Sequence, residues 1–217
     1  MSASISEVWK IIDAGDKSAL ELRAFHYADK SKVISKVFKT SSFESIDLMK
    51  REFELLTIEL NDKGYNIYTV MNPIKRDFQG GSAKDKDIAY RNLLLIDIDR
   101  AGATKSPAIN KEVKAAKSLA TEIAAYLTQL GWPQPIQAMS GNGWHLYYKL
   151  DQLNNDDENK SLIQKILKLL AKRFNNSVVN IDAVVYNASR ITKVPGTIAR
   201  KGEETEDRPY RKAVVCE

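Results

Sequence analysis

Residues 93–99 read Leu-Leu-Leu-Ile-Asp-Ile-Asp, a short apolar run that ends in two carboxylates. Side chains two residues apart on a β-strand share a face, so Asp97 and Asp99 would point one way, and Ile96 and Ile98 the other. Two carboxylates held side by side repel each other unless a cation lies between them. Mg²⁺ takes oxygen ligands of this kind together with phosphate oxygens. The run therefore predicts a buried strand that ends in a metal site, and the simpler alternative is a strand that ends in solvated aspartates.

Composition narrows the class of protein. The 217 residues are 43% hydrophobic and 28% charged, which fits one globular domain and neither a disordered chain nor a membrane protein. The opening residues, MSASISEVWK, lack the apolar run of a signal peptide, so we expect a cytoplasmic protein with no membrane partner. Lys and Arg outnumber Asp and Glu by 33 to 28, and the net charge of +5 suits a polyanionic partner.

Cysteine and histidine are scarce. Cys216 is the only cysteine, and His26 and His145 are the only histidines. A tetrahedral zinc site built from Cys and His needs four ligands, so we expect no zinc, and a single cysteine forms no internal disulfide. A cysteine–histidine nucleophile would have to recruit Cys216, next to the end of the sequence, which argues against that class of enzyme.

Apolar periodicity alternates between helical and strand patterns along the chain. The Ser41–Glu44 spacing is typical of a capping box ahead of the second helix, and the polar stretch 74–91 is expected to be a surface loop or lid. The alternation predicts an α+β fold, with helices packed on mostly antiparallel sheets. We expect helices at 5–12, 46–64, 113–131 and 163–174, and strands at 19–28, 32–39, 66–71, 93–99, 136–139, 144–150, 178–185 and 213–215.

A second motif, Ser140-Gly141-Asn142-Gly143-Trp144-His145, joins two expected strands. Small residues let backbone N–H groups approach an anion closely, and the serine hydroxyl and the histidine can add donors. This is how a triphosphate beside a metal would be held. An ordinary Asn-Gly hairpin turn would also explain the glycines. The stretch is neither a Walker A loop nor a dinucleotide-binding fingerprint.

A third set of candidate site residues lies in the last fifth of the sequence, at Asp182 and from Arg190 to Lys201. Asp182 lies in a β-branched stretch and could be a third carboxylate of the metal cluster, or it could cap a turn. From Arg190 to Lys201 the chain carries four cations and no acid. Arg190 can bind phosphate through two hydrogen bonds, while Lys193 acts as a point charge.

Taken together, the three sets suit metal-assisted nucleotidyl transfer. Three carboxylates from two strands would hold the ions that activate a 3′-hydroxyl and stabilise the pentavalent phosphate. The glycine-rich turn, the histidine and the cationic loop would hold the triphosphate in line for attack.

At these positions the chain resembles the archaeo-eukaryotic primase superfamily, in its plasmid, phage and CRISPR-associated primase-polymerase branch. The hydrophobic strand that ends in DxD is similar to residues 94–99, SGxGxH to residues 140–145, and a hydrophobic residue followed by an acid to residues 181–182. The motifs come in the family's order, and the similarity runs from about residue 19 to residue 211. Further stretches similar to this branch are 21–24, 68–73, 190–202 and 208–211.

The resemblance implies a fold and an activity. The fold would be a single catalytic domain over 1–217, with an N-terminal α/β module (about 1–75) and an RRM-like catalytic module (about 90–217). The activity would be template-directed synthesis of primers from two nucleotides, followed by their extension. The substrates would be NTPs or dNTPs, and the template single-stranded DNA.

The resemblance also assigns roles to individual residues. Asp97, Asp99 and Asp182 would be the catalytic ligands of two Mg²⁺ or Mn²⁺ ions. Many relatives carry a zinc module, which this chain cannot build, or continue into a helicase or accessory domain. Such a domain, or CRISPR proteins, would lie outside this chain. The implied nucleotide-binding residues are Ser140, Gly141, Asn142, Gly143, His145, Arg190, Lys193, Lys201, Asn72 and Arg23.

Two other functions fit part of the pattern. A DxD glycosyltransferase also uses an acid pair on a strand to hold a nucleotide-bound metal, although the glycine-rich turn and the basic loop do not fit it well. A non-catalytic binder of single-stranded nucleic acid would use Trp144, Tyr147 and Tyr148 for stacking.

Overall fold

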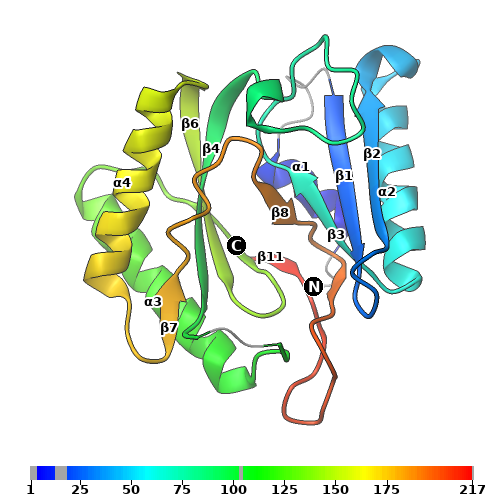
Figure 1. The fold of residues 1–217 in the computed structure, drawn as a ribbon. Helices are drawn as coiled ribbons and strands as arrows, with labels where there is room; N and C mark the ends of the chain where they lie inside the picture. Colours follow the sequence, from blue (N-terminus) through cyan, green and yellow to red (C-terminus); the bar gives the residue numbers. More distant parts are fainter. Residues whose placement is uncertain (1–3, 13–18, 103–104, 217) are drawn as a thin grey trace.

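The acid-bearing strand is an inner strand of a five-stranded antiparallel sheet, which faces a second antiparallel sheet of four strands (Figure 1). The computed structural model describes residues 4–12, 19–102 and 105–216. Helices cover the outer faces of both sheets, and the expected α+β class is confirmed. None of the described helices is long and apolar enough to cross a bilayer.

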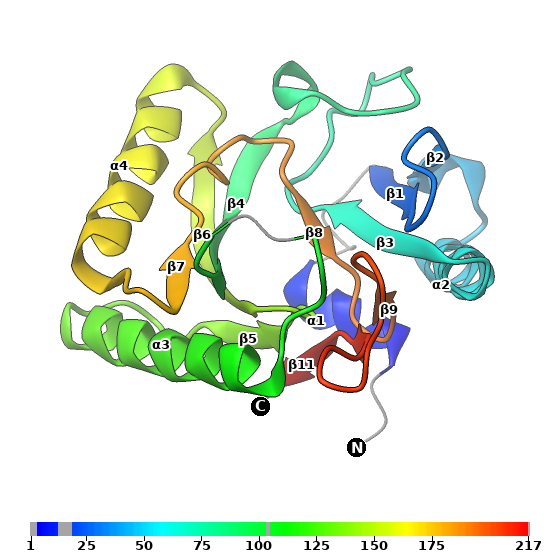
Figure 2. The same cartoon turned by 60° about the horizontal axis from the view of Figure 1, so that its bottom comes forward.

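The five-stranded sheet is built from the succession β4–α3–β5–β6–α4–β7. Its strands lie in the order β11-β5-β6-β4-β7, and this βαββαβ arrangement is the ferredoxin-like pattern that RRM domains share. Both helices lie on the same side of the sheet (Figure 2), and Ile96 and Ile98 of β4 are fully buried in the core. The elements are β4 (Tyr90–Arg100), α3 (Asn110–Gln129), β5 (Ile136–Met139), β6 (Trp144–Asn154), α4 (Asp157–Phe174), β7 (Val179–Ile181) and β11 (Val214–Cys216).

The four-stranded sheet has the order β2-β1-β3-β8 and carries α2 on its outer face. Met49 and Phe53 of α2 are fully buried in the core, as are Leu22 and Ile67 of the sheet. The helix begins after Ser45, whose Oγ accepts from the Leu48 N–H. The elements are β1 (Ala19–His26), β2 (Val33–Lys39), α2 (Ile46–Asp62), β3 (Tyr65–Val70) and β8 (Ile191–Lys193).

Three expectations about the elements are wrong. Ser41 and Glu44 do not form a capping box, because residues 40–42 form a separate 3-10 turn ahead of α2. The strand expected at 178–185 stops at Ile181, because the chain turns at Asp182, whose Oδ1 accepts from the Val184 N–H. Strand β8 was not expected at all, and it adds residues 191–193 to the first sheet.

The stretch expected to be a lid is fastened to the body of the protein. Its apolar side chains Ile74, Phe78 and Ile88 are buried in a small core of their own. Glu21, which is fully buried on β1, accepts a hydrogen bond from the Ala83 N–H through its second carboxylate oxygen. The remaining short elements are a 3-10 helix (Ile5–Glu7), α1 (Val8–Ile11), a 3-10 helix (Asp85–Asp87), β9 (Ile198–Ala199) and β10 (Arg211–Lys212).

Candidate active site

One row of side chains crosses three strands on the face of the large sheet that points away from α3 and α4. Asp97 on β4 lies directly opposite His145 on β6. On its other side, the Asp97 carbonyl accepts a hydrogen bond of 2.8 Å from the Asp182 N–H. Asp99 shares this face two residues further on, while Arg100 points to the helix side and pairs with Glu112 of α3. The structure therefore brings the three predicted carboxylates and the predicted histidine to one surface.

Cationic groups surround the acids. The Arg190 guanidinium lies 3.9 Å from Asp97 and 3.7 Å from Asp182, and His145 Nε2 lies 3.3 Å from Asp97 Oδ1. Burial alone would raise the pKa of Asp97, but the charges of His145, Arg190 and Lys201 outweigh it and lower that pKa. Asp97 is therefore ionised at neutral pH.

Asp99 is in a less favourable position. Burial raises its pKa to about 6, and the negative charge of Asp97 acts in the same direction. The chain thus places two carboxylates where their mutual repulsion is only partly offset. Such an arrangement is typical of a site that receives a cation.

The acids fit a divalent ion through the chemistry of their oxygens. Asp97 Oδ1 is buried, and although His145 Nε2 lies 3.3 Å away, this oxygen accepts no well-aligned hydrogen bond and stays available to a cation. Across residues 4–12, 19–102 and 105–216, no group of three His, Cys, Asp or Glu side chains is placed so that it could hold a metal by itself. Arg190 lies beside both Asp97 and Asp182 in this arrangement. Because Mg²⁺ usually takes one or two carboxylates and completes its shell with water and substrate phosphate, Asp97 and Asp99 are sufficient protein ligands for it.

The glycine-rich turn lies directly against the acids. The Ser140 N–H donates to the Gly143 carbonyl at 3.0 Å, and the Gly143 N–H donates to Ser140 Oγ at 3.1 Å. A Cβ at Gly143 would collide with the Asp99 carboxylate and the Ile98 carbonyl. Gly141 has a φ of +103° and lies against Ala199 of β9. Both glycines are therefore required by close approach as well as by the turn.

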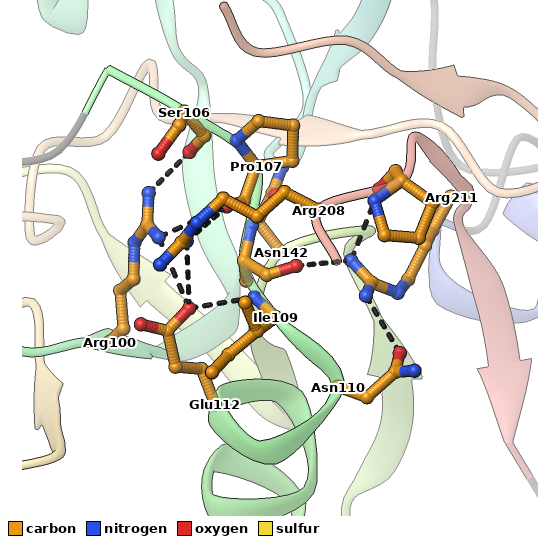
Figure 3. Close-up of polar contacts among 11 residues, drawn as sticks. Arg100, Ser106, Pro107, Ile109, Asn110, Glu112, Asn142, Arg208 and Arg211 are labelled. Atoms are coloured by element: carbon orange, nitrogen blue, oxygen red, sulfur yellow. Dashed lines mark hydrogen bonds and ion pairs between the residues drawn. The ribbon is translucent and has the colours of Figure 1, made fainter. Parts of the chain in front are cut away.

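The Asn142 side chain is held in place through its carbonyl oxygen, which leaves the assignment of its amide group to the nucleotide a prediction. Its Oδ1 accepts from the Ala108 N–H at 2.9 Å, just ahead of α3. The Ala108 carbonyl in turn accepts from Arg211 at 2.7 Å. Figure 3 shows Asn142 among the arginines that gather at this end of α3, where Arg100 and Arg208 both contact Glu112. In this structure the Asn142 carbonyl oxygen ties the turn to the α3 end of the molecule.

Strand β8, in the opposite sheet, carries Lys193. Lys193 is 5% exposed, donates to the Ile198 carbonyl and lies 5.3 Å from the centre of the Tyr68 ring. Burial, with some help from Arg200, lowers its pKa to about 7. Lys201 is exposed, and its charge lowers the pKa of both Asp97 and Asp99.

Arg23 and Asn72 occupy two very different places. Arg23 pairs across the sheet with Tyr68, which pairs with Lys193, so the three side chains stand in one row. Its guanidinium is bound by the carboxylate of Glu21. Asn72 is 2% exposed at the far end of β4, where its amide bonds the Ala188 carbonyl and the N–H groups of Asn92 and Leu93. Asn72 thus joins β3 to the beginning of β4, away from the acids.

Three further residues belong to the surroundings of the site. Tyr147 contacts both His145 and Thr192, and burial near Asp97 and Asp99 raises the pKa of Tyr68 to about 12. A signal for Tyr147 was present in the sequence, because it lies two residues after His145 and therefore shares its face of a strand. Tyr68 and Thr192 lie in two of the stretches similar to the primase-polymerase branch, but their approach to the acids and to Tyr147 had no signal in the sequence, because it depends on how the two sheets meet.

No family model matches the sequence, and no curated protein matches it. Solved structures do share the fold. The primase RepB′ aligns with 98% of this chain at a TM-score of 0.54 and 11% identity, and the chain spans 56% of its length. The catalytic domain of primase RepB′ in complex with initiator DNA aligns with 98% of the chain (TM-score 0.52, 10% identity), which covers 84% of that domain. The polymerase domain of Mycobacterium tuberculosis Ligase D in complex with DNA aligns with 96% (TM-score 0.53, 12% identity, 78% of that domain). The chain therefore shares the fold of these primase and polymerase domains.

Proposed function

We propose that this chain is a DNA primase-polymerase, which catalyses metal-dependent, template-directed nucleotidyl transfer. In this proposal it starts primers from two nucleotides and then extends them. The observation that carries the proposal is the row formed by His145, Asp97 and Asp182, with Asp99 beside it, on the open face of a primase-like sheet. The fold alone does not assign a reaction, so the argument depends on these side chains.

In this proposal the acids of the row bind metal ions, and the histidine and the neighbouring arginine bind the triphosphate. Asp97, Asp99 and Asp182 would hold Mg²⁺ or Mn²⁺. Bound there, the ions would lower the pKa of the attacking 3′-hydroxyl and offset charge on the phosphate that is transferred. His145 and Arg190 are placed to donate hydrogen bonds to the triphosphate oxygens. Positioned donors of this kind supply much of the catalysis in phosphoryl transfer.

The lowered pKa of Lys193 suits a site that binds a polyanion. A pKa of about 7 means that Lys193 is only partly protonated before substrate binds, and an approaching polyanion favours the charged form.

We propose single-stranded DNA as the template and NTPs or dNTPs as substrates. Two of the similar structures were solved in complex with DNA. A helicase, an accessory domain or CRISPR proteins as partners remain predictions.

The structure removes one argument for the non-catalytic binder. Trp144, Tyr147 and Tyr148 are 5%, 1% and 1% exposed, so they are core residues and are not available to stack on bases. Tyr147 is covered by Thr192 of the other sheet, and Tyr148 packs against Trp132. For the glycosyltransferase, binding of nucleotide-sugars remains the discriminating measurement.

Synthesis without a primer tests the proposal. Purified chain would be incubated with single-stranded DNA, labelled nucleotides and Mg²⁺ or Mn²⁺, and the products separated on a denaturing gel. We expect dinucleotides and longer products from the parent, and none from the Asp97→Asn, Asp99→Asn double variant.

The matched control is Asp151→Asn, which removes one exposed carboxylate further along β6. This variant should make as much product as the parent. Equal product from the double variant would overturn the role of the acids. Absence of product from the parent, with both metals and all nucleotides, would overturn de novo initiation.

A further inference from the structure

A chain of polar groups runs behind the acid row and connects the two sheets. His145 Nδ1 lies 2.7 Å from the Tyr147 hydroxyl, which lies 2.6 Å from Thr192 Oγ1. All three residues are buried, with 6%, 1% and 1% of their surfaces exposed. Each hydroxyl can donate only one proton, so the direction of these hydrogen bonds is constrained at both ends.

The contact between His145 and Asp97 determines which atoms donate in these hydrogen bonds. His145 Nε2 faces Asp97 Oδ1 at 3.3 Å, and a carboxylate oxygen presents lone pairs to its neighbours. A lone pair on Nε2 would face those lone pairs, so in the neutral imidazole Nε2 carries the proton and Nδ1 is the acceptor. The Tyr147 hydroxyl must then donate to Nδ1 and accept from Thr192. Burial raises the pKa of Tyr147, so this hydroxyl keeps its proton throughout the usual pH range.

Thr192, at the other end of this series of hydrogen bonds, lies on β8. Thr192 lies between Ile191 and Lys193 on that strand, and Arg190 immediately precedes it. Neighbouring side chains on a strand point to opposite faces, which lets Thr192 reach β6 while Lys193 faces Tyr68. The Thr192–Tyr147 contact therefore holds β8, which carries Lys193, against β6, which carries His145.

We propose that Tyr147 and Thr192 are positioning residues, which hold His145 in the tautomer that presents an Nε2–H donor to the acid row. The inference rests on the proposed function, because the donor is useful there only if a phosphate oxygen arrives. The opposite tautomer would present a lone pair and repel that oxygen. Neither hydroxyl takes part in the reaction itself.

The test compares two variants of one residue. Thr192→Val keeps the shape of the side chain and removes the hydroxyl, whereas Thr192→Ser keeps the hydroxyl and removes the methyl group. Long-range nitrogen NMR at pH 8 in EDTA reports which nitrogen of each histidine carries the proton. His26 is the only other histidine and serves as an internal reference in every spectrum.

We expect a protonated Nε2 on His145 in the parent and in Thr192→Ser, and a mixture of tautomers in Thr192→Val and Tyr147→Phe. Affinity for a non-hydrolysable nucleoside triphosphate with Mn²⁺, measured by calorimetry, should fall about tenfold in Thr192→Val, the effect of losing one hydrogen bond, and less than about threefold in Thr192→Ser.

Three results would overturn the inference. The first is a parent His145 protonated on Nδ1, and the second is an unchanged tautomer and affinity in both Thr192→Val and Tyr147→Phe. The third is an equal loss in Thr192→Val and Thr192→Ser, which would indicate packing rather than the hydroxyl. Because the NMR spectra need no catalysis, a parent that shows the predicted tautomer yet synthesises nothing contradicts only the proposed function.

Discussion

The ionised form of the Asp99 side chain is unfavourable in the folded protein. Asp99 is largely buried beside Asp97, and Gly143 approaches it so closely that no side chain fits between them. Its raised pKa means that the native state binds a proton more tightly than the unfolded chain does. At the scale of single residues, the fold thus keeps a carboxylate whose ionised form costs stability, as the proposed cation site would require.

This position predicts how stability depends on pH. With a pKa of 3.8 in the unfolded chain and about 6 in the folded protein, Asp99 destabilises the fold fully above pH 6 and not at all below pH 4. In EDTA at pH 7.5, Asp99→Asn should therefore raise the free energy of unfolding, by up to about 3 kcal/mol. The gain should disappear as the pH falls from 6 to 4.

Urea denaturation of both proteins across this pH range measures the effect. Addition of Mn²⁺ should stabilise the parent and leave Asp99→Asn nearly unchanged, because only the parent retains both carboxylates. A variant that is less stable than the parent at pH 7.5 would show that the Asp99 charge is compensated in the fold.

At the scale of elements, the turn between β5 and β6 fixes the distance between the motifs. Gly143→Ala would push a Cβ into the Ile98 carbonyl and the Asp99 carboxylate, so β4 and β6 must shift apart at the acids. We expect a loss of about 1–3 kcal/mol of stability and a marked loss of nucleotidyl transfer.

Gly81→Ala is the matched control. It places the same methyl group at a glycine with open space around its Cβ, and it should leave stability and activity close to the parent values. Thermal unfolding and primer extension would be measured on both variants. Similar behaviour of the two would contradict the close packing of the turn on the acids.

The elements also show how far sequence reasoning reaches. Helices α3 and α4 were predictable because each is long enough for its apolar period to be read, and the strand that ends in DxD was predictable from its short, continuous apolar run. Strand β8 was not predictable, because its three residues have no period of their own and are ordered by pairing with β3. Asp97 and Asp99 could be placed on one face from their spacing, whereas the approach of Arg190 and Thr192 depends on how the two sheets meet.

At the scale of the whole molecule, segments far apart in the sequence close the site. Asn61 at the end of α2 exchanges hydrogen bonds with both backbone groups of Ile198, and Asn66 on β3 does the same with Arg200. These bonds hold the β9 segment, and with it Lys201, against the first sheet. The acids come from the large sheet, while Arg190 leads into β8 and Lys193 lies on it. The candidate site therefore draws its residues from both sheets.

Extension of a primed template tests the central claim most directly, because it needs nucleotidyl transfer and no initiation. A labelled primer annealed to a longer template would be incubated with the chain, dNTPs or NTPs, and Mn²⁺ or Mg²⁺. We predict stepwise extension by the parent, and a rate lower by about a hundredfold or more in Asp97→Asn. A parent that binds the primed template but extends it with neither metal, or an Asp97→Asn variant that extends at the parent's rate, would contradict the account.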